Sequence, residues 1–260
     1  MAKIQIKTPQ EIDLMRKAGK ATAEILDLVS DIVRPGISTE EIDNFVHEQT
    51  LKRNGTPAPL GYKGFPKSCC TSVNDVVCHG IPSRDVILKD GDIINVDVTT
   101  ILEGYHGDSS RMYFVGGRDK SDSKIQELVD ITKEALYVGI GVVVPGARTG
   151  DIGYAIQKFV ESSGKNYGIV REYTGHGLGR EFHEAPQITH FGKKGTGYEL
   201  QPGMTFTIEP MLNIGDAYTY LSPKDGWTVT TKDGSMSAQW EHTVLVTTAG
   251  VEILTDSELF

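Results

Sequence analysis

The sequence predicts an α+β fold in which helices cover a largely antiparallel sheet. Segments with helical spacing are followed by blocks of strand-like residues joined by hairpin-length loops, whereas a parallel βαβ fold would alternate single strands with helices. The order helix, helix, strands also occurs twice along the 260 residues. No low-complexity linker separates the two occurrences, so we predict one domain spanning residues 1–260.

Four helices are predicted, two in each occurrence. The first follows the capping box Thr8-Pro9-Gln10-Glu11, after which apolar residues recur at helical spacing as far as Leu28. The second opens at Ser38 and the third at residue 123. A fourth is expected from about residues 149 to 163, after a Pro-Gly turn.

Four strands are predicted where β-branched and apolar residues dominate, at residues 93–101, 105–115, 204–209 and 239–247. Each contains one acid for which burial without a partner would be costly: Asp97, Asp108, Glu209 and Glu241. Surface acids on a solvated face are the more common arrangement, but the neighbouring Ile, Val, Met and Phe residues argue against it here. With His176, these acids resemble the ligand set of two divalent metal ions, which would make the protein a metallohydrolase.

The turn after the first strand decides how Asp97 lies relative to Asp108. A loop at Leu102-Glu103 places them directly opposite, whereas a loop at Glu103-Gly104 pairs Asp97 with Ser110 and leaves Asp108 diagonal on the same face. A three-residue loop would separate the faces. Like charges opposed across a strand pair destabilise it, and a bridging metal ion would turn that repulsion into coordination.

Short internal similarities suggest two pseudo-repeats, roughly residues 8–115 and 121–250. Three pairs of segments are similar and occur in the same order: residues 35–42 and 145–152, residues 79–82 and 183–186 (His-x-x-Pro), and residues 88–91 and 200–203. Any single match is weak evidence. Their common order indicates two related halves that each supply one wall of a site.

Composition excludes several classes of function. The net charge is −9 and no run of Lys or Arg stands out, which argues against direct nucleic-acid binding. No apolar run approaches the roughly 20 residues of a membrane span, and the N-terminus resembles neither a signal nor a transit peptide. Cys69, Cys70 and Cys78 form neither a disulfide framework nor a zinc-finger spacing, so we expect a cytoplasmic protein.

Seven motifs occur in the order found in one known family. They are Cys78-His79-Gly80-Ile81-Pro82, Asn95-Val96-Asp97, Gly104-Tyr105-His106-Gly107-Asp108, Gly175-His176-Gly177-Leu178-Gly179, Phe182-His183-Glu184, Ile208-Glu209-Pro210 and Gln239-Trp240-Glu241-His242-Thr243. Together they resemble the type I methionine aminopeptidases of the bacterial kind, over essentially the whole chain. The resemblance implies the pita-bread fold, in which two pseudo-symmetric halves surround a curved antiparallel sheet with helices outside and metals inside.

The resemblance also implies an activity and a set of ligands. The activity would be removal of the initiator methionine when the second residue is small, by attack of metal-activated water on the first peptide bond. Asp108 and Glu241 match the carboxylates that bridge two metals, Asp97 the chelating ligand of one metal, and His176 with Glu209 the remaining ligands of the other. Glu209 also matches the general base and later acid.

The histidines separate into three groups. His183 matches the imidazole that contacts the scissile carbonyl oxygen or the tetrahedral intermediate, and His79 the one near the scissile amide nitrogen of the substrate. His176 lies among Gly175, Gly177 and Gly179, which leave room for close approach of the backbone. The remaining histidines are expected to be surface or internally satisfied residues (His47 and His190), or packing residues on the strand face opposite the ligands (His106 and His242).

A pocket for methionine is implied by the family positions of five residues besides His79: Tyr62, Phe65, Cys70, Phe182 and Trp227. Aromatic walls and a thiol suit a polarizable thioether, although residues of these types are often ordinary core residues. Asn74, Val76 and Ser237 match positions whose backbone oxygens hold a structural monovalent cation in relatives. The divalent ions would be Co, Mn, Fe(II) or Zn.

The expected partners are nascent polypeptide N-termini, encountered at the ribosome, and the protein is expected to be a monomer without membrane or nucleic-acid contacts. Two alternatives share the fold. Prolidases and Xaa-Pro aminopeptidases usually carry an additional N-terminal domain, whereas this chain reaches its first helix by residue 9. Non-catalytic relatives lose metal ligands, and all five are present here. A type II enzyme is disfavoured because no helical insertion separates His183 from Glu209.

Overall fold

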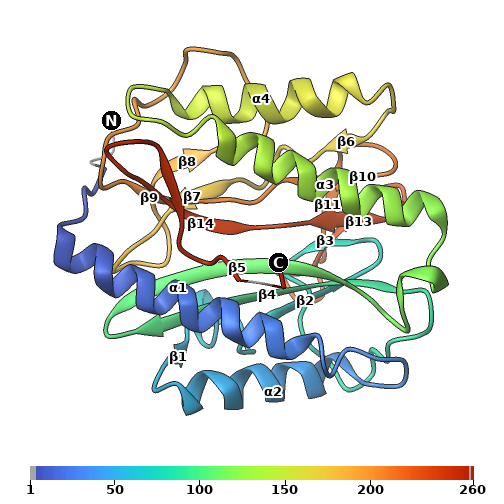
Figure 1. Cartoon of the computed structure of the whole chain (residues 1–260). Coiled ribbons are helices and arrows are strands. Elements are labelled where there is room, and N and C mark those ends of the chain that lie inside the picture. The colour runs from blue at the N-terminus through green and yellow to red at the C-terminus, as the bar shows by residue number, and fades with distance from the viewer. Residues whose placement is uncertain (1–3, 258) are drawn as a thin grey trace.

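Two pairs of helices lie on opposite sides of the strands in the structure, a computed structural model that describes residues 4–257 and 259–260 (Figure 1). α1 (Pro9–Val29) and α2 (Thr39–Lys52) form one pair, and α3 (Ser123–Gly141) and α4 (Thr149–Ser162) the other. All four predicted helices are therefore confirmed. In the part of the chain that is described, no helix is both long and apolar enough to cross a bilayer.

The helices begin where the sequence predicts. Thr8 and Ser38 each form a complete capping box with the Glu three residues later, which satisfies amides that the helix itself leaves unpaired. The third helix begins at Ser123, and the side chain of Asp122 caps it by accepting a hydrogen bond from the Lys124 amide.

The strands form four antiparallel sheets among the described residues. The first contains β1 (Thr56–Pro57), β2 (Cys70–Val73), β4 (Ile93–Leu102) and β5 (Tyr105–Phe114); the second β3 (Val76–Cys78), β11 (Thr219–Leu221) and β12 (Val229–Thr231); the third β6 (Gly168–Ile169), β10 (Met211–Asn213) and β13 (Ser237–Gln239). The fourth runs β15 (Val251–Ile253), β14 (His242–Val246), β9 (Thr205–Ile208), β7 (Gly175–Gly177) and β8 (Glu184–Ile188). Short 3-10 helices cover Tyr62–Gly64 and Arg118–Lys120. The predicted α+β arrangement is confirmed.

The β4–β5 hairpin adopts the second of the predicted registers. Its turn is at Glu103-Gly104, where both residues have positive φ, 51° and 81°. Asp97 therefore pairs with Ser110, and Asp108 pairs with Thr99. The two acids lie diagonally on one face of the hairpin, close enough to repel but not directly opposed.

The two strands predicted to contain Glu209 and Glu241 are shorter in the structure than predicted, and neither acid lies inside a strand. β9 ends at Ile208, and the predicted strand at residues 239–247 is divided into β13 and β14, so Glu209 and Glu241 lie between strands. The physical reason is a change of sheet: β13 pairs with β10, whereas β14 pairs with β9. The chain crosses from the fourth sheet to the third at Glu209 and back again at Glu241. Sequence pattern shows apolar extended residues in both places and does not show which neighbour they pair with.

Matching contacts occur in the two parts of the chain that resemble each other. The amide of Gly36 donates to Leu88 O before α2, and the amide of Gly146 donates to Leu200 O before α4. Both glycines have φ of 87°, a conformation that L side chains rarely adopt. We keep the division into residues 8–115 and 121–250 as a proposal, and call these segments the first half and the second half.

Separate hydrophobic cores support the helices of each half. In the first half, Leu26 and Ile42 pack with Val96 beneath α1 and α2. In the second, Leu136 and Ile156 pack with other buried residues beneath α3 and α4. β5 and β14 lie between these cores, side by side in the middle of the molecule (Figure 1). The residues that these two strands carry toward each other form the candidate site.

Candidate active site

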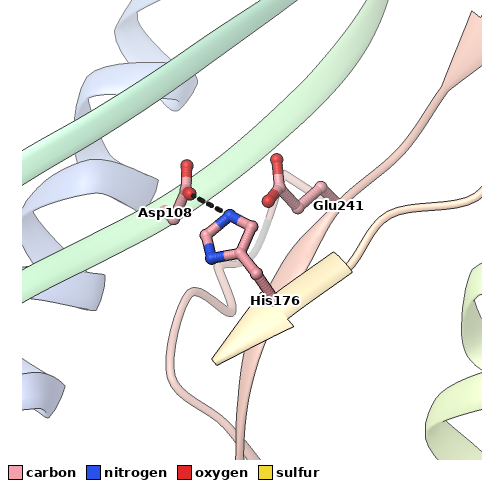
Figure 2. Close-up of side chains that lie close together, drawn as sticks. All are labelled: Asp108, His176 and Glu241. Carbon is pink, nitrogen blue, oxygen red and sulfur yellow. Dashed lines mark ion pairs between the residues drawn. The ribbon is translucent and has the colours of Figure 1, made fainter. Parts of the chain in front are cut away.

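One cavity of about 310 Å³ brings together all five predicted ligands, Asp97, Asp108, His176, Glu209 and Glu241. Figure 2 shows Asp108, His176 and Glu241 converging from three separate segments, with ligand atoms that all lie within 4.8 Å of one another. His176 Nε2 lies 3.5 Å from Asp108 Oδ2 and 3.8 Å from Glu209 Oε1. The sheets therefore assemble residues that are up to 144 positions apart in sequence, counting from Asp97 to Glu241 (241 − 97).

The first-half ligands are placed by the hairpin. Alternation along β4 and β5 turns Asp97 and Asp108 to the same face, and the hydroxyl of Thr99, the residue opposite Asp108, donates to Asp108 Oδ1 at 2.7 Å. Thr99 also lines the cavity. The same alternation that placed Asp97 in the sequence identifies Thr99, although no role was assigned to it.

His176 is held in β7 by two close backbone neighbours. A Cβ on Gly175 would lie 2.4 Å from Thr207 O, and one on Gly177 would lie 2.3 Å from Ala185 O, so neither position accepts a side chain. The His176 amide donates to Thr207 Oγ1 at 2.9 Å, and its Nδ1 lies 3.0 Å from Gly177 O. That second contact fixes the tautomer that leaves Nε2 facing the acids.

Glu209 is held by three side chains. Thr207 Oγ1 donates to Oε1 at 2.7 Å, Gln239 Nε2 to Oε2 at 3.3 Å, and the Glu209 amide to His190 Nε2 at 3.1 Å. None of these three contacts was predicted from the sequence. Of these, His190 was interpreted as a surface or satisfied residue, but it is fully buried and its Nδ1 has no partner in the described structure.

Glu241 is tied to the first half through its main chain. Its amide donates to Ser110 O at 3.2 Å, and its carbonyl accepts from Ser109 Oγ at 2.6 Å. Two residues after Glu241, the Thr243 hydroxyl donates a hydrogen bond to Asp108 O at 2.7 Å. These bonds cross between β5 and the β13–β14 break, so they set the separation of Asp108 from Glu241.

The electrostatics of the site call for added positive charge. Burial raises the pKa of Asp97 and Glu241 well above their usual range, and neighbouring carboxylates raise them further. Burial likewise raises the pKa of Glu209 to about 7. Burial alone would lower the pKa of His176, but its hydrogen bond with Asp108 and the charge of Glu209 raise it to about 9.

A proton on His176 is therefore the one cation that these residues supply among four acids. Oxygen-rich sites with one imidazole suit hard or borderline divalent ions. The donor set, its burial and its unbalanced charge all fit a divalent metal centre.

His79 and His183 both line the cavity and are neutral at pH 7. Burial lowers the pKa of each to about 4. The His183 ring lies 4.1 Å from the His176 ring and is stacked on Tyr62 at 5.2 Å, centroid to centroid. His79 has φ of 57°, a strained conformation for a side chain other than glycine, which is common at functional sites.

Every residue predicted for the methionine pocket lines this cavity: Tyr62, Phe65, Cys70, His79, Phe182 and Trp227. Phe65 packs edge-on against Trp227 at 5.2 Å, and Tyr62 packs against Phe182 at 4.9 Å. Cys70 pairs with Asp97 across β2 and β4, which places its thiol beside the acids. Lining residues that the sequence analysis did not identify include Lys63, Tyr173, Met211 and Gln239.

The two histidines beside ligands have different positions. His242 packs away from the site, where Nδ1 lies 2.9 Å from Thr255 Oγ1, in agreement with the prediction. The prediction was wrong for His106, because residues two apart on a strand share a face. His106 lies on the face of Asp108 and stacks on Phe182 at 5.6 Å, so it supports the wall of the pocket.

The three residues predicted to hold a monovalent cation lie close together outside the cavity. Asn74 directly follows β2, Val76 opens β3, and the Ser237 amide donates to Asn74 O at 2.9 Å. The Ser237 hydroxyl is buried without a partner among the described residues.

Known proteins resemble this chain over nearly all of its length. A model of metallopeptidase family M24 matches residues 13–248. The methionine aminopeptidase of Rickettsia prowazekii (strain Madrid E) is 53% identical over 252 residues, covering 97% of this chain and 95% of that protein. The methionine aminopeptidase of Escherichia coli (strain K12) is 51% identical over 253 residues, covering 97% of this chain and 94% of that protein.

Two solved structures resemble this chain to different degrees in fold and in sequence. The crystal structure of methionine aminopeptidase from Rickettsia prowazekii has a TM-score of 0.94 at 53% identity and covers 98% of this chain and 100% of that chain. The prolidase from Pyrococcus furiosus has a TM-score of 0.75 at 22% identity and covers 97% of this chain and 66% of that chain. At that identity, the likeness to the prolidase concerns the fold alone.

Proposed function

The chain belongs to metallopeptidase family M24 and has the pita-bread fold, and from this premise we propose that it removes the N-terminal methionine from peptides by metal-assisted hydrolysis of the first peptide bond. The observation that carries the proposal is the convergence of five buried or half-buried ligand side chains, four of them acids, in one cavity with aromatic lining residues. Prolidase activity is the alternative. It is disfavoured because the sequence identity lies with the methionine aminopeptidases.

Divalent metal ions would be held by Asp97, Asp108, His176, Glu209 and Glu241. We propose two ions, which these residues would hold together, with Co, Mn, Fe(II) or Zn as candidates. Bound there, the ions would polarise the scissile carbonyl and make an attacking water more acidic. The unbalanced acidity of the five side chains supports this ligand set.

Three further roles follow from the surroundings of the site. Glu209 is placed to take a proton from the attacking water and to return it to the leaving amine, because its carboxylate lies among the ligand side chains and is oriented by Thr207 and Gln239. His183 is neutral and can donate a hydrogen bond to the carbonyl oxygen as negative charge develops there. His79, which packs against Trp227, can contact the scissile amide nitrogen.

The pocket supports methionine as the side chain that is removed. Phe65 and Trp227 form one wall and Tyr62 with Phe182 another, while the Cys70 thiol lies at the acids. A flexible, polarizable thioether gains contact with aromatic edges without having to satisfy a polar group. We expect the residue after methionine to be small.

The expected substrates are therefore peptide N-termini, including those of nascent chains at the ribosome. We further propose a monomeric cytoplasmic protein, for which the three free cysteines provide support, since thiols persist in reducing compartments. A monovalent cation held by the backbone oxygens of Asn74, Val76 and Ser237 is a separate proposal. The unpartnered Ser237 hydroxyl nearby supports it.

A direct test measures cleavage of matched tripeptides by the protein reconstituted with Mn²⁺ or Co²⁺. Met-Ala and Met-Gly peptides should be cleaved, Met-Lys and Met-Leu peptides scarcely, and Glu209→Gln should be inactive on all of them. Preferential cleavage of Xaa-Pro peptides would contradict the proposal and favour prolidase activity.

A further inference from the structure

The backbone amide of Glu209 has an unusual partner for a residue in a sheet region. β9 ends one residue earlier, at Ile208, and Pro210 follows with no amide hydrogen of its own. Where the ladder stops, the Glu209 N–H donates instead to Nε2 of His190 at 3.1 Å. A side chain from the segment after β8 thus replaces the missing strand neighbour.

His190 makes this bond at a cost to the stability of the core. Its side chain is fully buried, and an Nε2 that accepts a hydrogen bond leaves the ring proton on Nδ1. Nδ1 has no partner among the described residues. An unpaired buried donor costs about 1–3 kcal/mol, so the Nδ1–H group of His190 destabilises the folded protein.

An apolar residue of similar size would leave the number of unpaired donors unchanged. Replacing His190 by Leu would remove the unpaired Nδ1–H and release the Glu209 N–H, exchanging one orphan donor for another while adding apolar contact. The net effect on folding should therefore be small. What would change is the position of the main chain at Glu209.

We infer that His190 is a positioning residue for Glu209, which it acts on through the main chain. The bond to His190 holds the Glu209 backbone at the point where the chain changes sheets. Thr207 and Gln239 then orient the carboxylate, at 2.7 Å and 3.3 Å, toward His176. The inference rests on the proposed role of Glu209 as a metal ligand and base.

The consequence is specific to one part of the site. Loss of the His190 acceptor should loosen the Glu209 carboxylate while leaving Asp97 and Asp108 in their hairpin register. Partners that orient a ligand typically contribute 10–100-fold to metal affinity or activity, and that is the size of effect expected here. KM for a Met-Ala peptide should change little, because His190 is absent from the cavity wall.

The test compares His190→Leu with His190→Gln, whose carboxamide oxygen can reach the position of Nε2. His47→Leu serves as the control, since His47 is bonded to Ser68 and lies away from the cavity. The measurements are Mn²⁺ affinity by calorimetry, kcat and KM on a Met-Ala peptide, and melting temperature in chelator. A trans-hydrogen-bond coupling between the Glu209 amide nitrogen and His190 Nε2 is measured by NMR on the metal-free wild type.

We expect His190→Leu to lose roughly 10–100-fold in Mn²⁺ affinity and in kcat, with a melting temperature in chelator close to that of wild type. His190→Gln should recover most of both losses, and His47→Leu should lose neither. Wild-type affinity and kcat in His190→Leu would overturn the inference. So would equal losses in the Leu and Gln variants together with lowered melting temperatures, since these would indicate packing alone.

Failure of the proposed function has a different signature. A wild-type protein that shows the coupling and binds Mn²⁺, but leaves methionine peptides intact, would contradict methionine removal. In that case, the affinity difference between the Leu and Gln variants still decides the role of His190.

Discussion

In the first half, Asp97 and Asp108 are interior residues of a hairpin with ten paired positions, whereas in the second half Glu209 and Glu241 lie in gaps between short strands. The hairpin places its ligands by backbone register, since every side chain on one face is set once the turn is set. The second half places its ligands by individual contacts: Gly175 and Gly177 around His176, His190 and Thr207 around Glu209, and Ser109 and Ser110 around Glu241.

This difference indicates that the two halves fix their site residues with different rigidity. Register cannot change by less than one residue, so the first half provides a rigid wall that does not depend on bound metal. Ligands held by single side-chain contacts can shift when one contact is lost. The second half is therefore where the site is adjustable, and Glu209, the proposed base, is located there.

The largest effect is expected from Asp108→Asn, which removes a first-half acid that lies close to His176 and Glu241. Tight binding of Mn²⁺ and turnover of a Met-Ala peptide should both be lost, while the metal-free protein keeps its fold, because Asn retains the size and the bond from Thr99. Calorimetry and peptide assays measure these effects. Asp119→Asn, an exposed acid in the short segment between the two halves, is the control and should match wild type. Wild-type metal affinity in Asp108→Asn would remove the first half from the metal site.

Replacing His183 and replacing His176, both in the second half, should impair different properties: turnover in the first case and metal binding in the second. His183→Ala should lower kcat by about 10²–10³ with KM nearly unchanged and metal content retained, since a donor that acts on developing charge contributes mainly to the transition state. His176→Ala should lose metal. Steady-state kinetics and elemental analysis separate the two outcomes. Metal loss in His183→Ala with retention in His176→Ala would reverse the ligand assignment.

A buried ion pair anchors the adjustable half to the segment before α1. Lys7 Nζ lies 2.5 Å from Glu184 Oε2, and their side chains are only 5% and 11% exposed. Lys7→Met should cost about 3–5 kcal/mol of unfolding free energy, because Glu184 would stay buried without its partner. Denaturant unfolding measures this cost.

The exposed pair Lys17–Glu103 provides the matched control, with side chains 55% and 52% exposed. Lys17→Met should change stability by less than about 1 kcal/mol. Equal effects of the two Lys→Met changes would show that the Lys7–Glu184 pair does not anchor the second half.

The last prediction concerns pH, and its effect on stability is spread over several pH units. The folded metal-free protein raises the pKa of Glu209 to about 7 from 4.5 and that of His176 to about 9 from 6.5. It therefore binds more protons than the unfolded chain between pH 6.5 and 9. Stability in chelator should fall as pH rises through this range, by about 1.4 kcal/mol per pH unit for each extra proton.

Melting curves at several pH values in chelator test this slope. Glu209→Gln should reduce it, and saturating Mn²⁺ should reduce it further by replacing the protons with a bound cation. A slope of the opposite sign would mean that these second-half groups are not buried together.

The first half was largely predictable from its sequence. Its helices are predicted by caps such as Thr8 with Glu11. Its strands are predicted by alternation, which sets Asp97 and Asp108 on one face. The turn was left open between registers because both Leu102-Glu103 and Glu103-Gly104 are plausible hairpin loops. The structure selects the second, in which Gly104 supplies one of the two positive φ angles.

The second half was predictable in its residues but not in its arrangement. Motif resemblance identified His176, Glu209 and Glu241, yet the predicted strands ran through both acids. Extended apolar residues look alike whether they continue one sheet or cross to another, since pairing partners lie far along the chain. His190 escaped notice for the same reason: its partner amide is 19 residues away and is defined only by the end of β9.

By itself, the sequence determined what is local or periodic: four helices, the face of the hairpin that carries acids, the chemical types of the ligands, and the family that they indicate. Tertiary structure decided which of the possible registers forms, where the chain changes sheets, and which buried side chains hold the ligands in place. The physical reason is the sequence separation of the residues that interact. Caps and alternation depend on residues within a few positions, whereas the spacing of Asp108 from Glu241 depends on hydrogen bonds that join β5 to a segment more than 130 residues later.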